Sequence, residues 1–161
     1  MHTDRTCTRQ DLIHLACEAM SERGLAPDFP PAVELELATL SGAPHDLDAT
    51  VADLRTLPWR SIDNDDSLDL DQLTACESLA SGAVCVRVAI ADVDALVLRG
   101  SAIDAQACLN TTSVYTSVRV FPMLPERLST DLTSLNVGQD RLALVTEMVV
   151  DAEGVLTSSP P

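Results

Sequence analysis

Five aspartates lie within nine residues near the middle of this chain, and they are its clearest candidates for chemistry. They belong to the segment Leu57–Leu73 and are Asp63, Asp65, Asp66, Asp69 and Asp71. Side chains alternate between the two faces of an extended segment. If the segment is extended, one face carries four carboxylates, those of Asp63, Asp65, Asp69 and Asp71. The opposite face carries apolar residues that a core could hold, which are Ile62, Leu68 and Leu70.

Carboxylates that share one face repel one another, so the cluster predicts a bound positive charge. Oxygen ligands at short spacing suit the hard cations Mg²⁺ and Ca²⁺ better than zinc. The calcium-binding loop of EF-hands requires Gly at its sixth position and Glu at its twelfth, where this chain, counted from Asp63, has Leu68 and Thr74. A Mg²⁺ site that keeps several waters and receives a phosphate is therefore the better interpretation, and a solvated acidic loop is the alternative.

The charge of the chain argues against a surface that grips nucleic acid by itself. Ten basic residues stand against 25 acidic ones, which gives a net charge of −15, and every basic residue is arginine. The chain has no long uncharged apolar run, so no membrane span is predicted. The N-terminus also lacks a signal-peptide pattern, and we therefore expect a cytoplasmic protein. Five cysteines without a CxxC pair indicate neither a disulfide framework nor a zinc site.

The residues before the acidic segment predict a short helical lead-in over residues 1–56. Thr8 and Asp11 have the spacing of a capping box, and apolar residues follow at helical intervals. His14 lies on this first helix without a partner at metal-ligand spacing, so we expect it at the surface. Three helices are expected: Arg9–Arg23, Pro31–Leu40 and Ala49–Leu57. For Pro31–Leu40 a strand is the alternative, because apolar and acidic residues alternate over residues 33–37.

Strand-forming residues dominate after the acidic segment and predict an α+β fold with a mixed, mainly antiparallel sheet. The expected elements are a strand Val84–Ile90, a helix Ser101–Leu109 behind a second capping box, a strand Thr112–Val120, a short helix near Pro125 and a strand Leu142–Val150. A hairpin turn is expected at Asp151–Gly154. The chain ends where the returning strand should run, so we expect an unpaired edge on the last long strand.

Five sequence blocks occur in a fixed order between residues 57 and 154. They are Leu57-Pro58-Trp59 with Ser61-Ile62-Asp63 and Asp69-Leu70-Asp71; Ile90–Val93 with Gly100-Ser101 and Asp104; Thr112–Tyr115; Arg119–Glu126; and Leu128-Ser129 with Ser134-Leu135-Asn136 and Arg141–Leu144. Together they resemble the start of the catalytic domain of the ribonuclease II/ribonuclease R family, the RNB domain. The resemblance implies that residues 57–161 are the N-terminal part of such a domain, whose C-terminal part and S1 RNA-binding domain are absent.

The resemblance also implies an activity and a set of site residues. The family hydrolyses single-stranded RNA from its 3′ end, with Mg²⁺, and releases nucleoside 5′-monophosphates. The implied metal ligands are Asp63, Asp69, Asp71 and Gln72, of which Asp71 is the catalytic aspartate. Gln72 occupies a position where the best-known members carry a fourth aspartate, and its neutral amide weakens the expected metal binding. Tyr115 is implied to pack against the nucleotide at the RNA 3′ end.

The family also uses a downstream arginine to stabilise charge on the phosphate, and this chain ends before it. We therefore expect little or no exoribonuclease activity from the isolated chain, which is either a truncated enzyme or one half of a split enzyme completed by a second chain. The alternative is a non-catalytic module for protein–protein interaction. Gln72, the acidic surface and the expected free strand edge favour that alternative.

Overall fold

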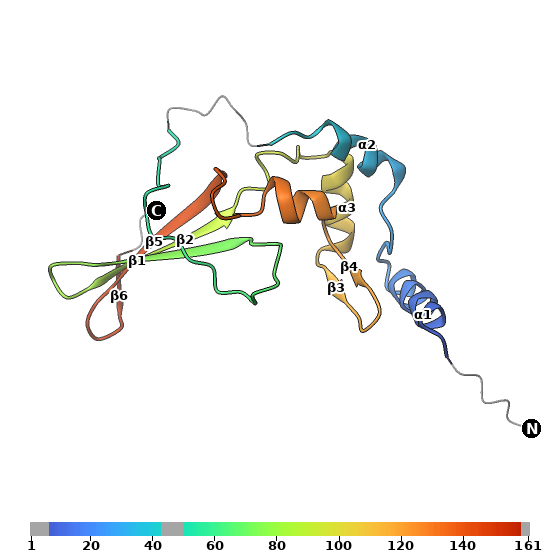
Figure 1. Ribbon diagram of the computed structural model, residues 1–161, viewed down its shortest axis with the longest axis horizontal. Helices are drawn as coiled ribbons and strands as arrows, with labels where there is room; N and C mark the ends of the chain where they lie inside the picture. Colours follow the sequence, from blue (N-terminus) through green and yellow to red (C-terminus); the bar gives the residue numbers. More distant parts are fainter. Residues whose placement is uncertain (1–6, 43–49, 159–161) are drawn as a thin grey trace, which may run out of the picture. The chain divides into compact units, whose positions relative to one another are not determined.

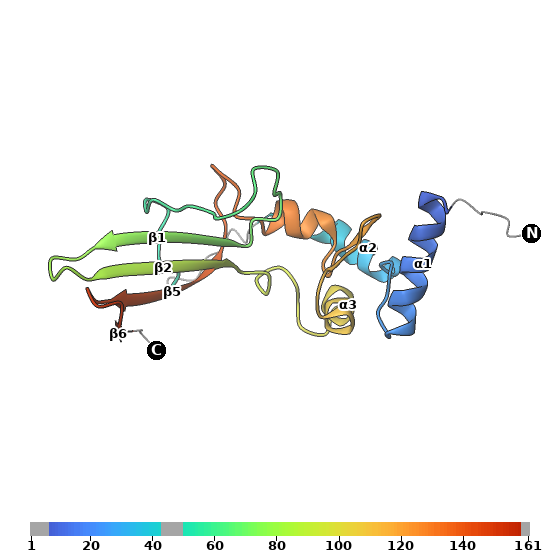
Figure 2. The same ribbon diagram turned by 90° about the horizontal axis from the view of Figure 1, so that it is seen from below.

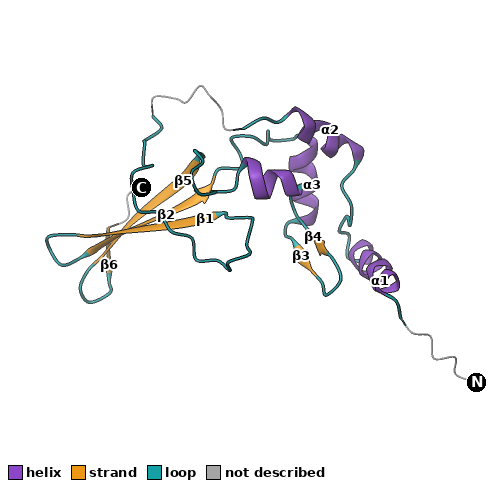
Figure 3. Cartoon of the chain, in the orientation of Figure 1, coloured by secondary structure: helices purple, strands orange, loops and turns teal. Residues whose placement is uncertain are grey.

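The computed structural model describes residues 7–42 and 50–158 (Figure 1). Their helices and strands, coloured by type in Figure 3, are α1 (Arg9–Glu22), α2 (Pro31–Thr39), β1 (Gln72–Ser78), β2 (Val84–Ala91), α3 (Ala102–Asn110), β3 (Val114–Tyr115), β4 (Val120–Phe121), the π-helix η1 (Leu128–Leu132), β5 (Ala143–Val150) and β6 (Leu156–Ser158). This is the expected mixture of short N-terminal helices and a mainly antiparallel sheet. Within the described ranges, no helix is long and apolar enough to cross a bilayer.

The chain divides into two compact units, each built from two stretches of sequence. Unit 1 comprises Met1–Leu40 and Val97–Glu126, and unit 2 comprises Ser41–Leu96 and Arg127–Pro161. These units are groups of residues that pack together, and each contains residues from both sides of position 56. They do not test the predicted domain boundary near residue 56, which stays a prediction.

Helix α1 of unit 1 begins with the predicted capping box. The Asp11 backbone N–H donates to Thr8 Oγ1 at 3.2 Å, and the Thr8 N–H donates to Asp11 Oδ2 at 2.8 Å. These bonds satisfy two amides that a helix start leaves without partners. The Thr8 hydroxyl also donates to Asp11 Oδ2 at 2.7 Å, and this bond, together with the one from the Thr8 N–H, lowers the pKa of Asp11. His14 is exposed and lies 3.2 Å from Glu18, so its expected surface position is confirmed.

Helix α3 contacts both α2 and the link between α1 and α2, and these elements surround the core of unit 1. The Ile103 N–H donates to Glu36 Oε2 at 3.0 Å, which ties the start of α3 to α2. At the other end of α3, buried Asn110 bonds Ala26 twice, through Oδ1 to its N–H at 2.9 Å and through Nδ2 to its carbonyl at 3.0 Å. The apolar core between these elements contains Met20, Val33, Leu37, Ile103 and Phe121.

The predicted continuous strand over residues 112–120 is wrong, because this stretch folds back as a hairpin. Strands β3 and β4 pair antiparallel, with Val114 opposite Phe121 and Tyr115 opposite Val120. A tight loop closed by the side chain of Thr116 separates them. The β-branched residues of the stretch therefore form two short strands and not one long one.

The sheet of unit 2 has the strand order β1-β2-β5-β6, with every neighbouring pair antiparallel. Figure 2 shows β1, β2 and β5 side by side. Strand β5 pairs with β2 along its whole length, and its end pairs with β6 after the predicted turn, where the Gly154 N–H donates to the Asp151 carbonyl. Because β6 pairs only with Val149 and Val150, the rest of this edge of β5, Ala143–Met148, has no partner strand among the described residues. The expected unpaired edge is therefore present over most of the last long strand and wrong only at its end.

The two faces of this sheet differ in exposure. One face contains the buried residues Ala75, Cys85, Ala89 and Ala91. It also carries Arg87, which donates to Glu147 at 2.7 Å and to Glu77 at 3.1 Å and so links three neighbouring strands. The other face is more exposed, and its exposed large apolar residues in β2 and β5 are Val84, Ile90 and Leu144.

The predicted helix Ala49–Leu57 is wrong for its described part, since residues 50–57 form turns and irregular chain. Asp53 bonds both the backbone and the guanidinium of Arg55, which favours a local turn. The indole of Trp59 donates to the Leu54 carbonyl at 2.9 Å, and Pro58 disfavours a helical conformation at the residue before it. Residue 49 lies outside the described residues.

Candidate functional site

The acidic segment of unit 2 is not continuously extended. The Ser67 N–H donates to the Asn64 carbonyl at 3.1 Å, and Asp65 and Asp66 occupy the turn that this bond closes. The predicted alternation of faces over residues 62–71 is therefore wrong. Ile62 and Leu68, expected in a core, are 86% and 65% exposed.

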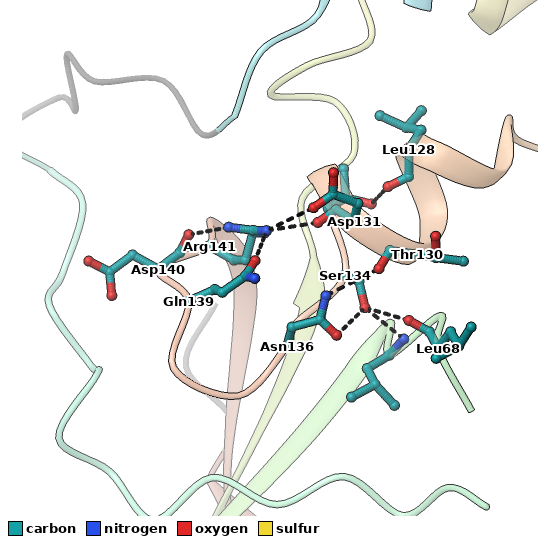
Figure 4. A network of polar contacts seen from close by, with 11 residues as sticks. Leu68, Leu128, Thr130, Asp131, Ser134, Asn136, Gln139, Asp140 and Arg141 are labelled. Carbon is teal, nitrogen blue, oxygen red and sulfur yellow. Dashed lines mark hydrogen bonds and ion pairs between the residues drawn. The ribbon is translucent and has the colours of Figure 1, made fainter. Parts of the chain in front are cut away.

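The backbone on both sides of Asp69 is held by one buried serine. The hydroxyl of Ser134, a residue that is only 1% exposed, donates to the Leu68 carbonyl at 2.9 Å and accepts from the Leu70 N–H at 3.0 Å (Figure 4). The Leu135 N–H adds a bond of 2.8 Å to the Leu70 carbonyl. These bonds fix the main chain on which the Asp69 carboxylate stands.

Ser134 is in turn part of a polar network that reaches η1. Its hydroxyl lies 3.2 Å from Asn136 Oδ1, and Asn136 Nδ2 donates to the Thr130 carbonyl at 3.1 Å (Figure 4). Nearby, Arg141 donates to the carbonyls of Asp131 and Asp140 at 2.8 and 2.9 Å. Ser134 and Asn136 belong to one of the five sequence blocks, but no role is predicted for them from the sequence.

The end of the acidic segment runs directly into the sheet. The Asp71 carbonyl accepts from the Ala91 N–H at 2.9 Å, and Gln72 is the first residue of β1, opposite Ile90. Asp63, Asp69, Asp71 and Gln72 are all exposed. The structure thus anchors the backbone at Asp69 and Asp71 and leaves their side chains accessible to solvent.

The predicted metal ligands supply suitable atoms but not a preformed cage. Carboxylate and amide oxygens are the donors that Mg²⁺ takes in proteins. In the part of the chain that the structure describes, however, no three Asp, Glu, His or Cys side chains are placed to hold one ion together. An ion at this segment would therefore need water or phosphate oxygens to complete its shell.

Tyr115, the predicted RNA contact, belongs to unit 1, whereas the acidic segment belongs to unit 2. The tyrosine is 71% exposed on the β3–β4 hairpin. An aromatic ring in this position can receive a nucleobase without displacing protein atoms.

Asp92 supports the chain where β2 ends. Its Oδ1 accepts from the Ala95 N–H at 3.3 Å, and its own N–H donates to the Leu142 carbonyl at 3.0 Å. It borders a small cavity of unit 2 of about 10 Å³, which Arg141 and Thr133 also line. That volume suits a single water molecule.

The comparisons with known proteins cover the acidic segment and the sheet that follows it. The RNB domain family matches residues 51–160. Ribonuclease R of Escherichia coli is 43% identical over 130 residues, which are 80% of this chain and 16% of that protein. Ribonuclease R of Thermotoga maritima is 43% identical over 102 residues, which are 63% of this chain and 14% of that protein. This chain thus spans only a small part of the length of these relatives.

Solved structures agree with the sequence comparison. Mycoplasma genitalium RNase R in complex with ribose-methylated single-stranded RNA has a TM-score of 0.82 and 31% identity, covering 94% of this chain and 23% of that one. Its complex with double-stranded RNA has a TM-score of 0.80, also at 31% identity, covering 94% of this chain and 26% of that one. Yeast Ssd1, described as a pseudonuclease, shares the fold alone, with a TM-score of 0.51 and 19% identity over 56% of this chain and 11% of that one.

Proposed function

Because the chain belongs to the RNB domain family, we propose that it is the N-terminal part of a ribonuclease R-like enzyme that degrades single-stranded RNA from the 3′ end in the cytoplasm. The observation that carries the proposal is the match over residues 51–160, a range that includes the acidic segment and Tyr115. The RNA complexes of a similar ribonuclease R support RNA as the ligand.

In this proposal the acidic segment binds Mg²⁺ through Asp63, Asp69, Asp71 and Gln72, and Asp71 is the catalytic aspartate. When bound, the ion would supply positive charge at a phosphate oxygen. The exposed carboxylates on an anchored backbone support this assignment. Since three of them do not converge in the described residues, we expect weak binding of Mg²⁺ in the absence of RNA.

Tyr115 makes the proposed contact with the RNA, by stacking on a nucleobase. Stacking is tolerant of base identity, as an enzyme that degrades RNA of any sequence requires. A chain with net charge −15 has few cations to place on phosphates, so its RNA affinity should depend only weakly on salt. A steep salt dependence would argue for a different mode of binding.

A chimera tests whether the acidic segment is competent for catalysis. Residues 51–160 replace the matching segment of E. coli ribonuclease R, and the release of labelled nucleoside monophosphates from a uniformly labelled single-stranded RNA is measured with Mg²⁺. We expect activity that Asp71→Asn abolishes and that Asp94→Asn, a change at an exposed aspartate outside the segment, leaves unchanged. A folded chimera without activity would count against the proposal.

The isolated 161-residue chain is expected to show little or no exoribonuclease activity, because it spans only a small part of the length of its ribonuclease R relatives. The same assay with the purified chain checks this. Mg²⁺-dependent release of mononucleotides that is lost in Asp71→Asn would show that the chain is active alone.

A second candidate is a non-catalytic module that binds a protein partner. The uncharged Gln72 and the lack of three converging carboxylates among the described residues favour this candidate. Light scattering coupled to size-exclusion chromatography tests it, since a well-folded monomer that forms no complex would count against it.

A further inference from the structure

The hairpin that carries Tyr115 has one exposed face and one buried face. Directly opposite residues of two antiparallel strands lie on the same face. Tyr115 and Val120 form one such pair, and both are exposed. Val114 and Phe121 form the other, in which Phe121 is buried and Val114 half-buried. The contacts that fix the buried face of the hairpin therefore determine the direction of the Tyr115 side chain.

The loop of the hairpin couples Arg119 to Tyr115. The Thr116 hydroxyl donates to the Arg119 carbonyl at 2.6 Å and accepts from the Arg119 N–H at 3.1 Å. The Thr116 N–H also donates to that carbonyl, at 3.1 Å. Because Thr116 follows Tyr115 directly, these bonds couple the backbone of Arg119 to the residue next to Tyr115.

The side chain of Arg119 joins the hairpin to the N-terminal elements of unit 1. Its Nη2 donates to Asp28 Oδ1 at 2.7 Å and to the Pro27 carbonyl at 3.1 Å, and its Nη1 lies 3.8 Å from Cys17 Sγ on α1. The guanidinium also stands over the Phe121 ring, 4.5 Å from its centroid. One side chain thus contacts α1, the link between α1 and α2, and the buried face of the hairpin.

Helix α1 makes a second contact with the hairpin. Arg9 Nη2 donates to the Val118 carbonyl in the hairpin loop at 2.8 Å. The hydrogen bond to Asp28 raises the pKa of Arg119 further above its usual range, so the guanidinium stays charged. Arg119 is thus paired with a carboxylate, and Arg9 adds a bond to a neutral carbonyl.

We propose that Arg119 is a positioning residue for RNA binding, because it fastens the hairpin to the N-terminal helical segment with the Tyr115 ring facing outward. This inference rests on the proposed stacking of RNA on Tyr115. It gives the residues before the acidic segment a role, since Cys17, Pro27 and Asp28 hold the guanidinium that orients the hairpin.

A double-mutant cycle on the full 161-residue chain tests the proposal. Affinity for a fluorescein-labelled single-stranded oligoribonucleotide is measured by anisotropy for wild type, Arg119→Met, Tyr115→Ala and the double variant. Tyr115→Ala should weaken binding about tenfold to a hundredfold, as expected for one lost stacking contact. Arg119→Met should weaken binding several-fold in the presence of Tyr115 and have no effect in the Tyr115→Ala background.

Two readouts separate positioning from direct contact and from general destabilisation. If Arg119 bound a phosphate, Arg119→Met would lower the salt dependence of binding, whereas a positioning role leaves that slope unchanged. Tyr115 is the only tyrosine, so a chain labelled with 3-fluorotyrosine gives one fluorine resonance, which Arg119→Met should shift before RNA is added. The matched control is Arg23→Met, whose guanidinium bonds Ala19 within α1.

The outcomes distinguish this proposal from the proposed function. If Tyr115→Ala leaves RNA binding unchanged, the RNA contact itself is wrong, and the positioning role fails with it. If Tyr115→Ala weakens binding but Arg119→Met acts equally in both backgrounds or not at all, only the positioning role is overturned. Asp28→Asn, which keeps Arg119 and removes its ion pair, should repeat the effect of Arg119→Met in weaker form, and it replaces that variant if Arg119→Met does not fold.

Discussion

Replacing Ser134 by alanine removes a single hydroxyl that serves two backbone groups of the acidic segment. In the variant the Leu68 carbonyl and the Leu70 N–H lose their partner at a residue that is almost completely buried. A buried polar group left without a partner costs about 1 to 3 kcal/mol. Because both backbone groups are only partly buried, water replaces some of the lost bonding, and we expect Ser134→Ala to lower the free energy of unfolding by about 2 to 3 kcal/mol.

Urea unfolding measures this loss, with the fluorescence of Trp59 as the signal. Trp59 is the only tryptophan and belongs to unit 2, the unit that contains Ser134. The exposed Ser61, in the same acidic segment, provides the control Ser61→Ala, which should change the free energy of unfolding by less than about 0.5 kcal/mol. Amide hydrogen exchange at Leu70 should also become faster in Ser134→Ala.

The reasoning would be refuted if Ser134→Ala and Ser61→Ala had the same stability within about 0.5 kcal/mol, the usual range of neutral surface changes. Such a result would mean that the acidic segment does not depend on the Ser134 hydroxyl for its conformation. An unchanged exchange rate at Leu70 would lead to the same conclusion from a single amide.

Three further predictions follow from charged and thiol groups of unit 2. Arg87→Met should lower the free energy of unfolding by about 1 to 2 kcal/mol in urea melts, because two glutamates of neighbouring strands lose their common partner. Arg55 lowers the pKa of Asp53 from 3.8 to about 2, so this ion pair adds stability above pH 4 that is lost as the pH falls toward 2; acid unfolding of Arg55→Met should lack that contribution. Burial raises the pKa of Cys85, so its neutral thiol favours the folded state at neutral pH. This contribution to stability declines at alkaline pH, where the Cys85 thiol of the unfolded chain loses its proton. In the folded protein, Cys85 should react with a disulfide reagent far more slowly than the exposed Cys76.

The elements that the sequence predicts best are those fixed by neighbouring residues. The capping box of Thr8 and Asp11 requires only residues three positions apart, and the helix begins where it predicts. The strands β2 and β5 follow from long β-branched runs and are present nearly as expected. The turn after β5 is likewise local, since Asp151 and Gly154 form it themselves.

The elements that the sequence misplaces depend on contacts that no local pattern contains. The stretch around Thr116 looks like one strand until the hydroxyl of that residue bonds the Arg119 backbone and closes a loop. The acidic segment looks extended until Asn64 and Ser67 form a turn. β1 was not foreseen, because its mixed residues have no alternating apolar pattern and it is a strand through its pairing with β2.

For the candidate site, residue types were easier to predict than geometry. Asp63, Asp69, Asp71, Gln72 and Tyr115 were named from the family's motifs, and their roles stay predictions. Ser134 could not be recognised from spacing, because its effect on Asp69 arises from a contact across more than sixty positions. A small buried polar residue acquires such a role only when the fold brings two backbone groups to it.

The interleaving of the two units has a consequence for synthesis on the ribosome. Strands β1 and β2 form a local hairpin, but Ala91 of β2 pairs with Ala143, about fifty residues later. The second stretch of unit 1 lies within that interval. At about 5 to 20 residues per second, the open edge of β2 waits several seconds for β5 to emerge. A nascent chain of this protein therefore presents an apolar strand to other chains and to chaperones before its own partner strand exists.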